Sequence, residues 1–184
     1  MLFAAIFLFH RLDLINISEE DIQEAIITVS QFSKNYQTFK YANELTKGIP
    51  LIYTWDEFSS IGRILKVFFN VHAKHFAMHS SIPEADFNEI EALSYGNPSV
   101  VPIFIYPAGE RFHKARLLIN TFKLMTSSKM TPLTFDMQGE SSFAQITHAT
   151  MFFEMVSERL AKKKKVQPES RRAIKDLRDK LHHL

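Results

Sequence analysis

The chain changes character near residue 160, and this change limits what it can fold into. Apolar residues recur in stripes up to that point, whereas the remainder opens with Lys162, Lys163, Lys164 and Lys165 and stays highly charged to Leu184. From Ala161 onward nine Lys and Arg face three Asp and Glu, a balance of +6, so residues 1–160 must sum to −4 for a whole chain of +2. We predict one globular domain over residues 1–160, and a basic linker with an amphipathic helix over residues 161–184.

The composition supports a single core. Of the 184 residues 46% are hydrophobic and 12% aromatic, which is enough for one well-packed core and too little for two large ones. The chain has no cysteine, which excludes disulfides, thiolate metal ligands and cysteine nucleophiles. Stability must therefore come from packing, and we expect a cytoplasmic protein.

The first nine residues, MLFAAIFLF, form an apolar run about half as long as a membrane-spanning helix requires. No basic segment precedes the run, and His10, Arg11 and Asp13 follow it in place of a small-residue cleavage site. We expect a buried strand or a first core helix here, with no transmembrane segment and no signal peptide.

Apolar residues at helical spacing predict most of the secondary structure. Ser18 and the acidic residues after it form a variant of the capping box, which predicts a helix start. The stripe that follows consists of Ile22, Ala25, Ile26, Val29 and Phe32. Similar stripes predict four more helices, over residues 55–78, 81–96, 110–125 and 142–161.

Short apolar runs between these helices predict two or three strands. Leu51–Tyr53 and Pro132–Phe135 are brief, and Ser99–Tyr106 is rich in β-branched and aromatic residues. Pro102 lacks a backbone donor, which favours an edge position for its strand. The expected fold class is a helix-dominated α+β domain with about five body helices, two or three short strands and a C-terminal amphipathic helix.

His72, His75 and His79 form the one cluster that suggests metal chemistry. On a helix these offsets place the imidazoles on one face, where they could meet zinc. The same stripe already contains Phe58 and Leu65, however, and the outer histidines would be separated by about 10 Å of helix rise. We therefore expect structural or partner-facing histidines, no metal and no cofactor.

Motifs of known catalytic classes are missing from the sequence. No serine lies in a GxSxG motif, and the five glycines are too scattered to form a dinucleotide-binding fingerprint or a phosphate loop. The sequence therefore predicts a protein that is not an enzyme.

The tail carries the clearest interaction signal. Ile174, Leu177 and Leu181 recur at three- and four-residue steps and form an apolar seam, which we expect to bind a protein partner. Acidic residues four positions from basic ones weaken the field of the tail. Electrostatic contacts are expected from Lys162, Lys163, Lys164, Lys165, Arg171 and Arg172.

These observations favour a non-catalytic adaptor or chaperone-like subunit that joins one or more proteins in a hetero-complex. Aromatic residues exceed what the predicted helix faces need, and they either line a partner groove or fill an aromatic core. The surplus residues are Phe3, Phe7, Phe9, Tyr36, Phe39, Tyr41, Phe152 and Phe153.

Two alternatives stay open at this point. One is a nucleic-acid-binding protein whose basic tail supplies nonspecific affinity. The other is an enzyme or metal protein built on the His72, His75 and His79 cluster or on His148. The oligomeric state and the identity of the partner are not fixed by the sequence.

Overall fold

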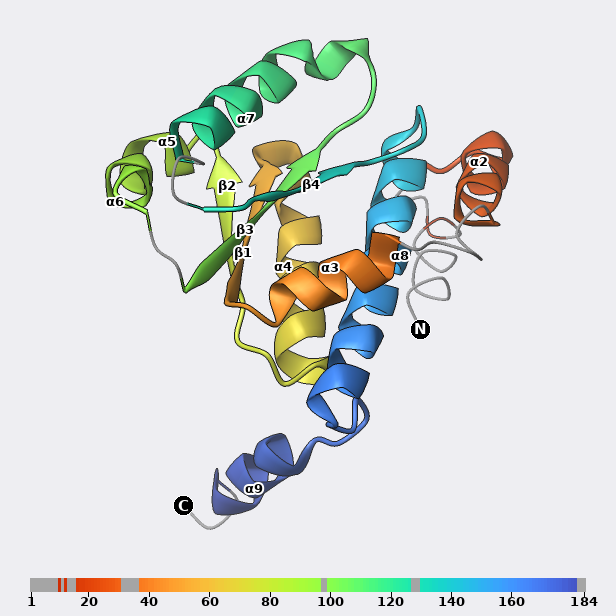
Figure 1. Ribbon diagram of the computed structural model, residues 1–184. Coiled ribbons are helices and arrows are strands. Elements are labelled where there is room, and N and C mark those ends of the chain that lie inside the picture. Colours follow the sequence, from red (N-terminus) through yellow and green to blue (C-terminus); the bar gives the residue numbers. More distant parts are fainter. Residues whose placement is uncertain are drawn as a thin grey trace.

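The centre of the computed structural model is a sheet of four parallel strands (Figure 1). The structure describes residues 10, 12, 16–30, 37–96, 99–126 and 130–181. The strands, in the spatial order β2-β1-β3-β4, are β1 Ile49–Trp55, β2 Met78–Ile82, β3 Val100–Tyr106 and β4 Leu133–Asp136.

Helices cover both faces of this sheet (Figure 1). On one face lie α3 (Gln37–Leu45), α4 (Ser59–Val67) and α8 (Ser142–Lys164), and on the other lie α5 (Ala85–Asn88), α6 (Ile90–Ser94) and α7 (His113–Thr126). The remaining two helices are α2 (Glu19–Ser30), which packs on α8, and α9 (Arg172–Leu181). The predicted helix-dominated α+β fold is therefore wrong, because the chain is an α/β domain with a parallel sheet between two helical layers.

Three of the four strands were expected as short apolar runs, and the strand that was missed is β2, because helices were predicted to end at residue 78 and to begin at residue 81. β1 and β3 are buried on both faces. Ile52 and Ile103 project toward α3, α4 and α8, whereas Tyr53 and Phe104 project toward α5, α6 and α7. A strand that is covered on both sides is a continuous apolar run without polar alternation, so its sequence resembles a buried helix segment.

The edge position predicted from Pro102 is also wrong. β3 lies inside the sheet, between β1 and β4, and Pro102 pairs in register with Leu51. The proline removes one donor from the ladder. Burial of nearly the whole seven-residue strand outweighs that loss.

The long helix predicted for residues 55–78 is much shorter in the structure. A 3₁₀ turn at Asp56–Phe58 leads into α4, and a π-helical turn at Phe68–His72 ends it. Lys74 then takes a left-handed conformation with φ 49°, which no helix can continue through. The chain becomes extended, and β2 starts at Met78.

The helix predicted after Ser18 is confirmed as α2, but only Ala25 and Val29 of the predicted stripe lie on its buried face. The Ser18 hydroxyl accepts from the Asp21 N–H at 3.0 Å, and the Asp21 carboxylate accepts from the Ser18 N–H at 3.0 Å. Ala25 is buried against α8, whereas Ile22 and Ile26 are exposed. The Glu24 carboxylate fixes this orientation, because it accepts the N–H groups of the loop before α8. Phe32 lies outside the described residues.

Aromatic side chains fill the core between the sheet and α8. Phe152 lies 5.1 Å from Tyr41, 4.6 Å from Phe135 and 5.1 Å from Phe153, measured between ring centroids. Three of the surplus aromatics are therefore core residues, whereas Phe39 is exposed under the Arg159 guanidinium at 3.6 Å. Phe3, Phe7, Phe9 and Tyr36 lie outside the described residues, as does the predicted element at residues 1–9.

Two further predictions of local structure are confirmed: a 3₁₀ turn at Glu110–Phe112 leads into α7, and β4 lies where Pro132–Phe135 predicted a strand. The single helix predicted for residues 81–96 is only partly right, because β2 extends to Ile82 and the two short helices α5 and α6 follow it. Ser141 caps α8 by accepting the Ala144 N–H at 3.1 Å. In the part of the chain that the structure describes, no helix is both long and apolar enough to cross a membrane.

The aromatic core yields a direct stability test. We expect Phe152→Ala to lower the free energy of unfolding by about 3–5 kcal/mol, because it leaves a cavity among the rings of Tyr41, Phe135 and Phe153. The exposed Phe87 is the matched control, and Phe87→Ala should cost less than about 0.5 kcal/mol. Urea unfolding followed by circular dichroism measures both; equal losses would contradict the assigned core.

The domain boundary near residue 160 stays a prediction, with one refinement. α8 continues to Lys164, and its residues Leu160 and Ala161 are fully buried, whereas α9 has no buried residue. We expect a chain that ends after Val166 to melt cooperatively, with a melting temperature within a few degrees of the full chain. A broad thermal transition, or a much lower midpoint, would show that the tail is part of the core.

Candidate functional site

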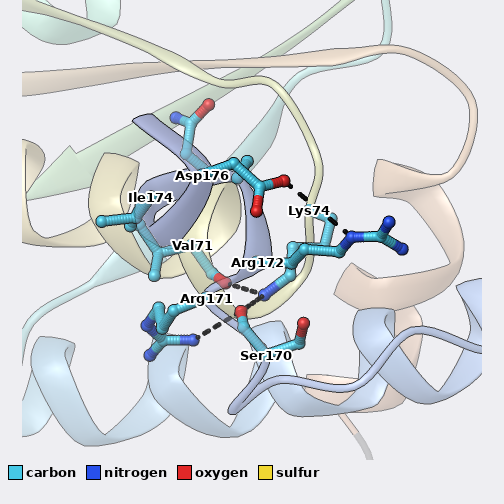
Figure 2. A pocket seen from close by; sticks show the side chains of 9 residues that line it. Val71, Lys74, Ser170, Arg171, Arg172, Ile174 and Asp176 are labelled. Carbon is cyan, nitrogen blue, oxygen red and sulfur yellow. Dashed lines mark hydrogen bonds and ion pairs between the residues drawn. The ribbon is translucent and has the colours of Figure 1, made fainter. Parts of the chain in front are cut away.

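A hollow of about 460 Å³ lies between the end of the helix that follows β1 and the start of α9 (Figure 2). We call it the α4–α9 hollow. Asn70, Val71 and Lys74 line it from the π-helical turn and the loop after it. From the tail it is lined by Ser170, Arg171, Arg172, Ala173, Ile174 and Asp176. π-helical turns occur frequently at functional sites, which draws attention to this end of α4.

Lys74 connects the two walls of the hollow. Its ammonium donates to the backbone carbonyls of Val71 at 2.5 Å, Ser170 at 2.8 Å and Pro168 at 3.3 Å. A left-handed conformation costs a residue with a side chain roughly 1–2 kcal/mol. The three carbonyl contacts offset this cost and hold the segment before α9 against the body (Figure 2).

Lys164 supports this arrangement from α8. Its ammonium donates to the Lys74 carbonyl at 2.6 Å and lies 3.2 Å from Nδ1 of His75. An ammonium can only donate, so Nδ1 accepts and Nε2 of His75 donates to the Gly48 carbonyl at 2.9 Å. Burial lowers the pKa of Lys164.

The charge of the hollow suits an anion. Lys74, Arg171 and Arg172 contribute three positive charges, and Asp176 is the one carboxylate among the lining residues, with Oδ2 at 3.9 Å from Nε of Arg172. Partial burial, followed by the charge of Arg171, lowers the pKa of Lys74. An anion would relieve this crowding of cations, and guanidinium groups match the geometry of phosphate oxygens.

The residues predicted for electrostatic contact do not all reach this place. Arg171 and Arg172 line the hollow, and Lys164 contacts it indirectly, through its hydrogen bond to the Lys74 carbonyl. Lys162 and Lys165 line a separate hollow beside Glu158 and Glu169. Lys74 was not predicted, because the helical stripe placed it inside a helix and gave it no special position.

The three histidines of the predicted cluster make unrelated contacts. His72 stacks on Phe68 with ring centroids 5.2 Å apart, His75 bonds to Gly48, and Nε2 of His79 lies 2.9 Å from the Thr54 hydroxyl. The common helical face is wrong because the helix ends at His72. Among the described residues, no group of three or more His, Cys, Asp or Glu side chains could hold a metal ion.

His79 occupies space that a glycine leaves open. A Cβ atom on Gly62 would lie 2.0 Å from Cδ2 of His79, so no larger residue fits in α4 at this point. Burial lowers the pKa of His79, and the charges of Arg63 and Lys66 lower it further. The neutral imidazole is therefore a packing and hydrogen-bonding group between α4 and β2.

A second polar hollow, of about 510 Å³, lies beside this histidine. Arg63 and Lys66 are its basic residues, and Glu84 and Glu89 balance them. Glu89 already accepts the Tyr53 hydroxyl at 2.5 Å. With its charges balanced, this hollow suits an anion less well than the α4–α9 hollow does.

The carboxyl ends of β1 and β3 are the place where ligands commonly bind in open α/β sheets. In this chain protein groups bind one another there. Arg111 donates to Glu57 at 3.2 Å and to the Ser142 hydroxyl at 2.7 Å, and the Gln145 amide bonds both backbone groups of Ala108. The α4–α9 hollow is therefore the better candidate.

His148, which the sequence offered as an enzymatic residue, is structural. Its ring is buried and stacks on Phe135 at 5.0 Å, and Nδ1 accepts the Gln138 N–H at 3.2 Å. Burial lowers the pKa of His148 to about 4. The imidazole is therefore neutral near pH 7 and lies in the core.

The parallel sheet between two helical layers defines the chain as an α/β domain, and comparison with known proteins identifies the family. Residues 34–181 match the bacterial phospho-glucose isomerase C-terminal SIS domain, and the chain belongs to this family. A bifunctional phosphoglucose/phosphomannose isomerase from Thermoplasma acidophilum is 27% identical over 170 residues, which make up 88% of this chain and 52% of that protein.

Solved structures share the fold. A glucose-6-phosphate isomerase-like protein from Thermus thermophilus superposes with a TM-score of 0.58 and 18% identity over 74% of this chain and 46% of that one. A hypothetical protein from the same organism gives a TM-score of 0.65 and 10% identity over 88% of this chain and 49% of that one. The chain thus spans about half the length of these relatives.

The family overturns two predictions from the sequence. A non-catalytic adaptor or chaperone-like subunit is wrong, and so is the assignment as a non-enzyme, because the family and its relatives point to sugar-phosphate isomerases. The match also extends through α9, so the basic tail is part of the family region. The sequence did not reveal the hollow because its walls lie far apart in the chain, with no short motif to connect them.

The buried state of His148 predicts a specific pH dependence. Its folded pKa of about 4 lies below the unfolded value near 6.5, so the unfolded chain binds more protons between these values. Stability should therefore fall as the pH drops from 6.5 toward 4. We expect His148→Gln to reduce this slope in urea unfolding, whereas His113→Gln, at an exposed position on α7, should leave it unchanged; equal slopes in all three proteins would contradict the assignment.

Proposed function

We propose that this chain is the sugar-phosphate-binding module of a phosphosugar isomerase, and that the α4–α9 hollow receives the phosphate. The observation that carries the proposal is the excess of Lys74, Arg171 and Arg172 over the single carboxylate of Asp176, in a chain of this family. A phosphate monoester carries between one and two negative charges near pH 7 and offers several acceptor oxygens. It matches both the charge and the donor geometry of the hollow.

The other lining residues suit the sugar. Val71, Ala173 and Ile174 present apolar surface to the C–H groups of a sugar. The Asn70 amide donates to the carbonyls of Lys66 at 2.8 Å and Ala77 at 3.1 Å, which leaves the amide oxygen to accept from a sugar hydroxyl. A hexose phosphate is therefore the ligand class that we assign.

Isomerisation between aldose and ketose requires a base that moves a proton between neighbouring carbon atoms. Asp176 is the carboxylate that the hollow offers for this step. It lies next to Arg172 at the phosphate end, and its side chain is largely exposed. We therefore assign the remaining acid–base groups to the part of the relatives that this chain does not span.

A second function follows from the same observation. With its one carboxylate beside the phosphate-binding arginine, the hollow also suits binding of a sugar phosphate without turnover. We also propose a cytoplasmic location, supported by the charged ligand class and by the absence of cysteine.

Binding can be measured by calorimetric titration with glucose 6-phosphate. We expect Arg172→Gln and Lys74→Met each to weaken binding about tenfold or more. Arg172→Gln removes a charged hydrogen-bond donor to phosphate, whereas Lys74→Met removes a positive charge and the carbonyl contacts that hold the segment before Arg171 and Arg172. Lys114→Gln on α7 changes the net charge equally and should leave the affinity unchanged. Glucose without phosphate should not bind; if glucose binds as tightly, or if all three variants match the parent, the phosphate assignment fails.

Turnover is a separate measurement. Proton NMR in D₂O detects exchange at C2 of the sugar phosphate, which isomerisation requires. Exchange that is lost in Asp176→Asn supports an isomerase whose base lies in this chain and contradicts the second function. Binding without any exchange contradicts Asp176 as a base that acts in this chain alone.

A further inference from the structure

The C-terminal helix presents an uncovered apolar surface. In α9 the seam residues Ile174, Leu177 and Leu181 are 46%, 58% and 59% exposed, and no residue of the helix is buried. At about 100° per residue, Arg178 and Lys180 flank the seam on its two sides. The surface is therefore apolar with basic borders.

Helix α2 presents the complementary surface. Ile22, Ile26 and Ile27 are 42%, 63% and 61% exposed, on a helix whose opposite side packs on α8. Glu19 and Glu20 lie exposed at its start, and the sequence of the helix, EEDIQEAIITVS, has four acidic residues and no Lys or Arg. The α2 surface is therefore apolar with an acidic border.

The two surfaces lie at opposite ends of α8 (Figure 1). Glu24 of α2 bonds to the N–H groups of Glu140 and Ser141, just before α8 begins. α8 then runs for 23 residues, about 34 Å, before the linker to α9. Lys74 holds this linker at Pro168 and Ser170, and α9 is only about 15 Å long with its ten residues. The helices therefore cannot meet within one chain while the tether holds.

We propose that α9 of one copy docks on α2 of a second copy of this chain. The warrant is charge complementarity on two apolar surfaces that the described part of their own chain leaves open: α9 has four basic and two acidic residues, and α2 has four acidic and none basic. The net charges of the two parts of the chain are also opposite, with −4 for residues 1–160 and +6 for the tail. A two-fold dimer forms this contact twice, which doubles the area buried and satisfies both seams.

Docking and ligand binding share one residue of the tail, because Ile174 belongs to the seam and also lines the α4–α9 hollow. Arg171 and Arg172 line the hollow as well, whereas Leu177, Arg178, Lys180 and Leu181 do not. The helix contact is therefore tested at residues outside the proposed sugar-phosphate site, and the test needs no ligand.

The absence of cysteine allows a clean cross-linking test on the full chain. Ile26→Cys and Leu177→Cys are prepared as separate proteins, mixed and oxidised. We expect a disulfide-linked species of twice the chain mass from this mixture, and at least tenfold less from Leu177→Cys mixed with Leu124→Cys, an equally exposed position on α7. Links mainly between two Leu177→Cys chains, or mainly to Leu124→Cys, would overturn the assignment to α2.

Light scattering during size-exclusion chromatography tests the charges. Glu19→Lys with Glu20→Lys should raise the dimer dissociation constant tenfold or more, as should Arg178→Glu with Lys180→Glu. Because the contact pairs opposite charges, a mixed dimer of the two reversed proteins has a wild-type pair in one contact and a swapped pair in the other, so mixing should restore both contacts. Combining all four changes in one chain should also restore both, each as a swapped pair. Two results would overturn the proposal. The first is a parent chain that stays monomeric at a concentration of about 100 µM, and the second is a pair of charge reversals that do not rescue each other.

Discussion

Burial of β1 and β3 on both faces is the constraint on which the rest of the structure depends. Strands that are apolar on both sides need a helical layer over each face, and parallel strands need crossover helices to return the chain to the same edge. The adjacent residues Ile52 and Tyr53 illustrate this need for two helical layers, because both are fully buried and they lie on opposite sides of the sheet. The crossovers bring the end of α4 next to the end of α8, and this adjacency creates the α4–α9 hollow.

Lys74 connects the end of α4 to the segment before α9 and so forms the candidate site. Its left-handed conformation ends the helix, and its ammonium holds the carbonyls of Pro168 and Ser170, so that Arg171 and Arg172 are presented beside it. Cations brought together in this way repel one another unless an anion or a carboxylate lies among them. The hollow therefore favours a negatively charged group. This preference agrees with a family that is named for phospho-glucose isomerases.

The tail has two roles that the same ten-residue helix can serve at once. Its first turn faces the hollow, and its later residues Leu177 and Leu181 face outward. The relatives are about twice as long as this chain, and in them further protein lies beside the matched region. The proposed docking of α9 on α2 would give this chain a comparable contact with a second copy.

The sequence by itself determined the features that depend on neighbouring residues. The capping box of Ser18 and Asp21, the cap of Ser141, the periodic α7 and α8, and the amphipathic α9 all follow from contacts within a few positions. Only the tertiary structure decided that residues 78–82 form the strand β2 and that β3 lies inside a parallel sheet, because strand pairing joins segments that are far apart in the chain. It also decided that Lys74 meets Ser170, across almost one hundred residues, because such contacts arise from the packing of the sheet and its crossovers.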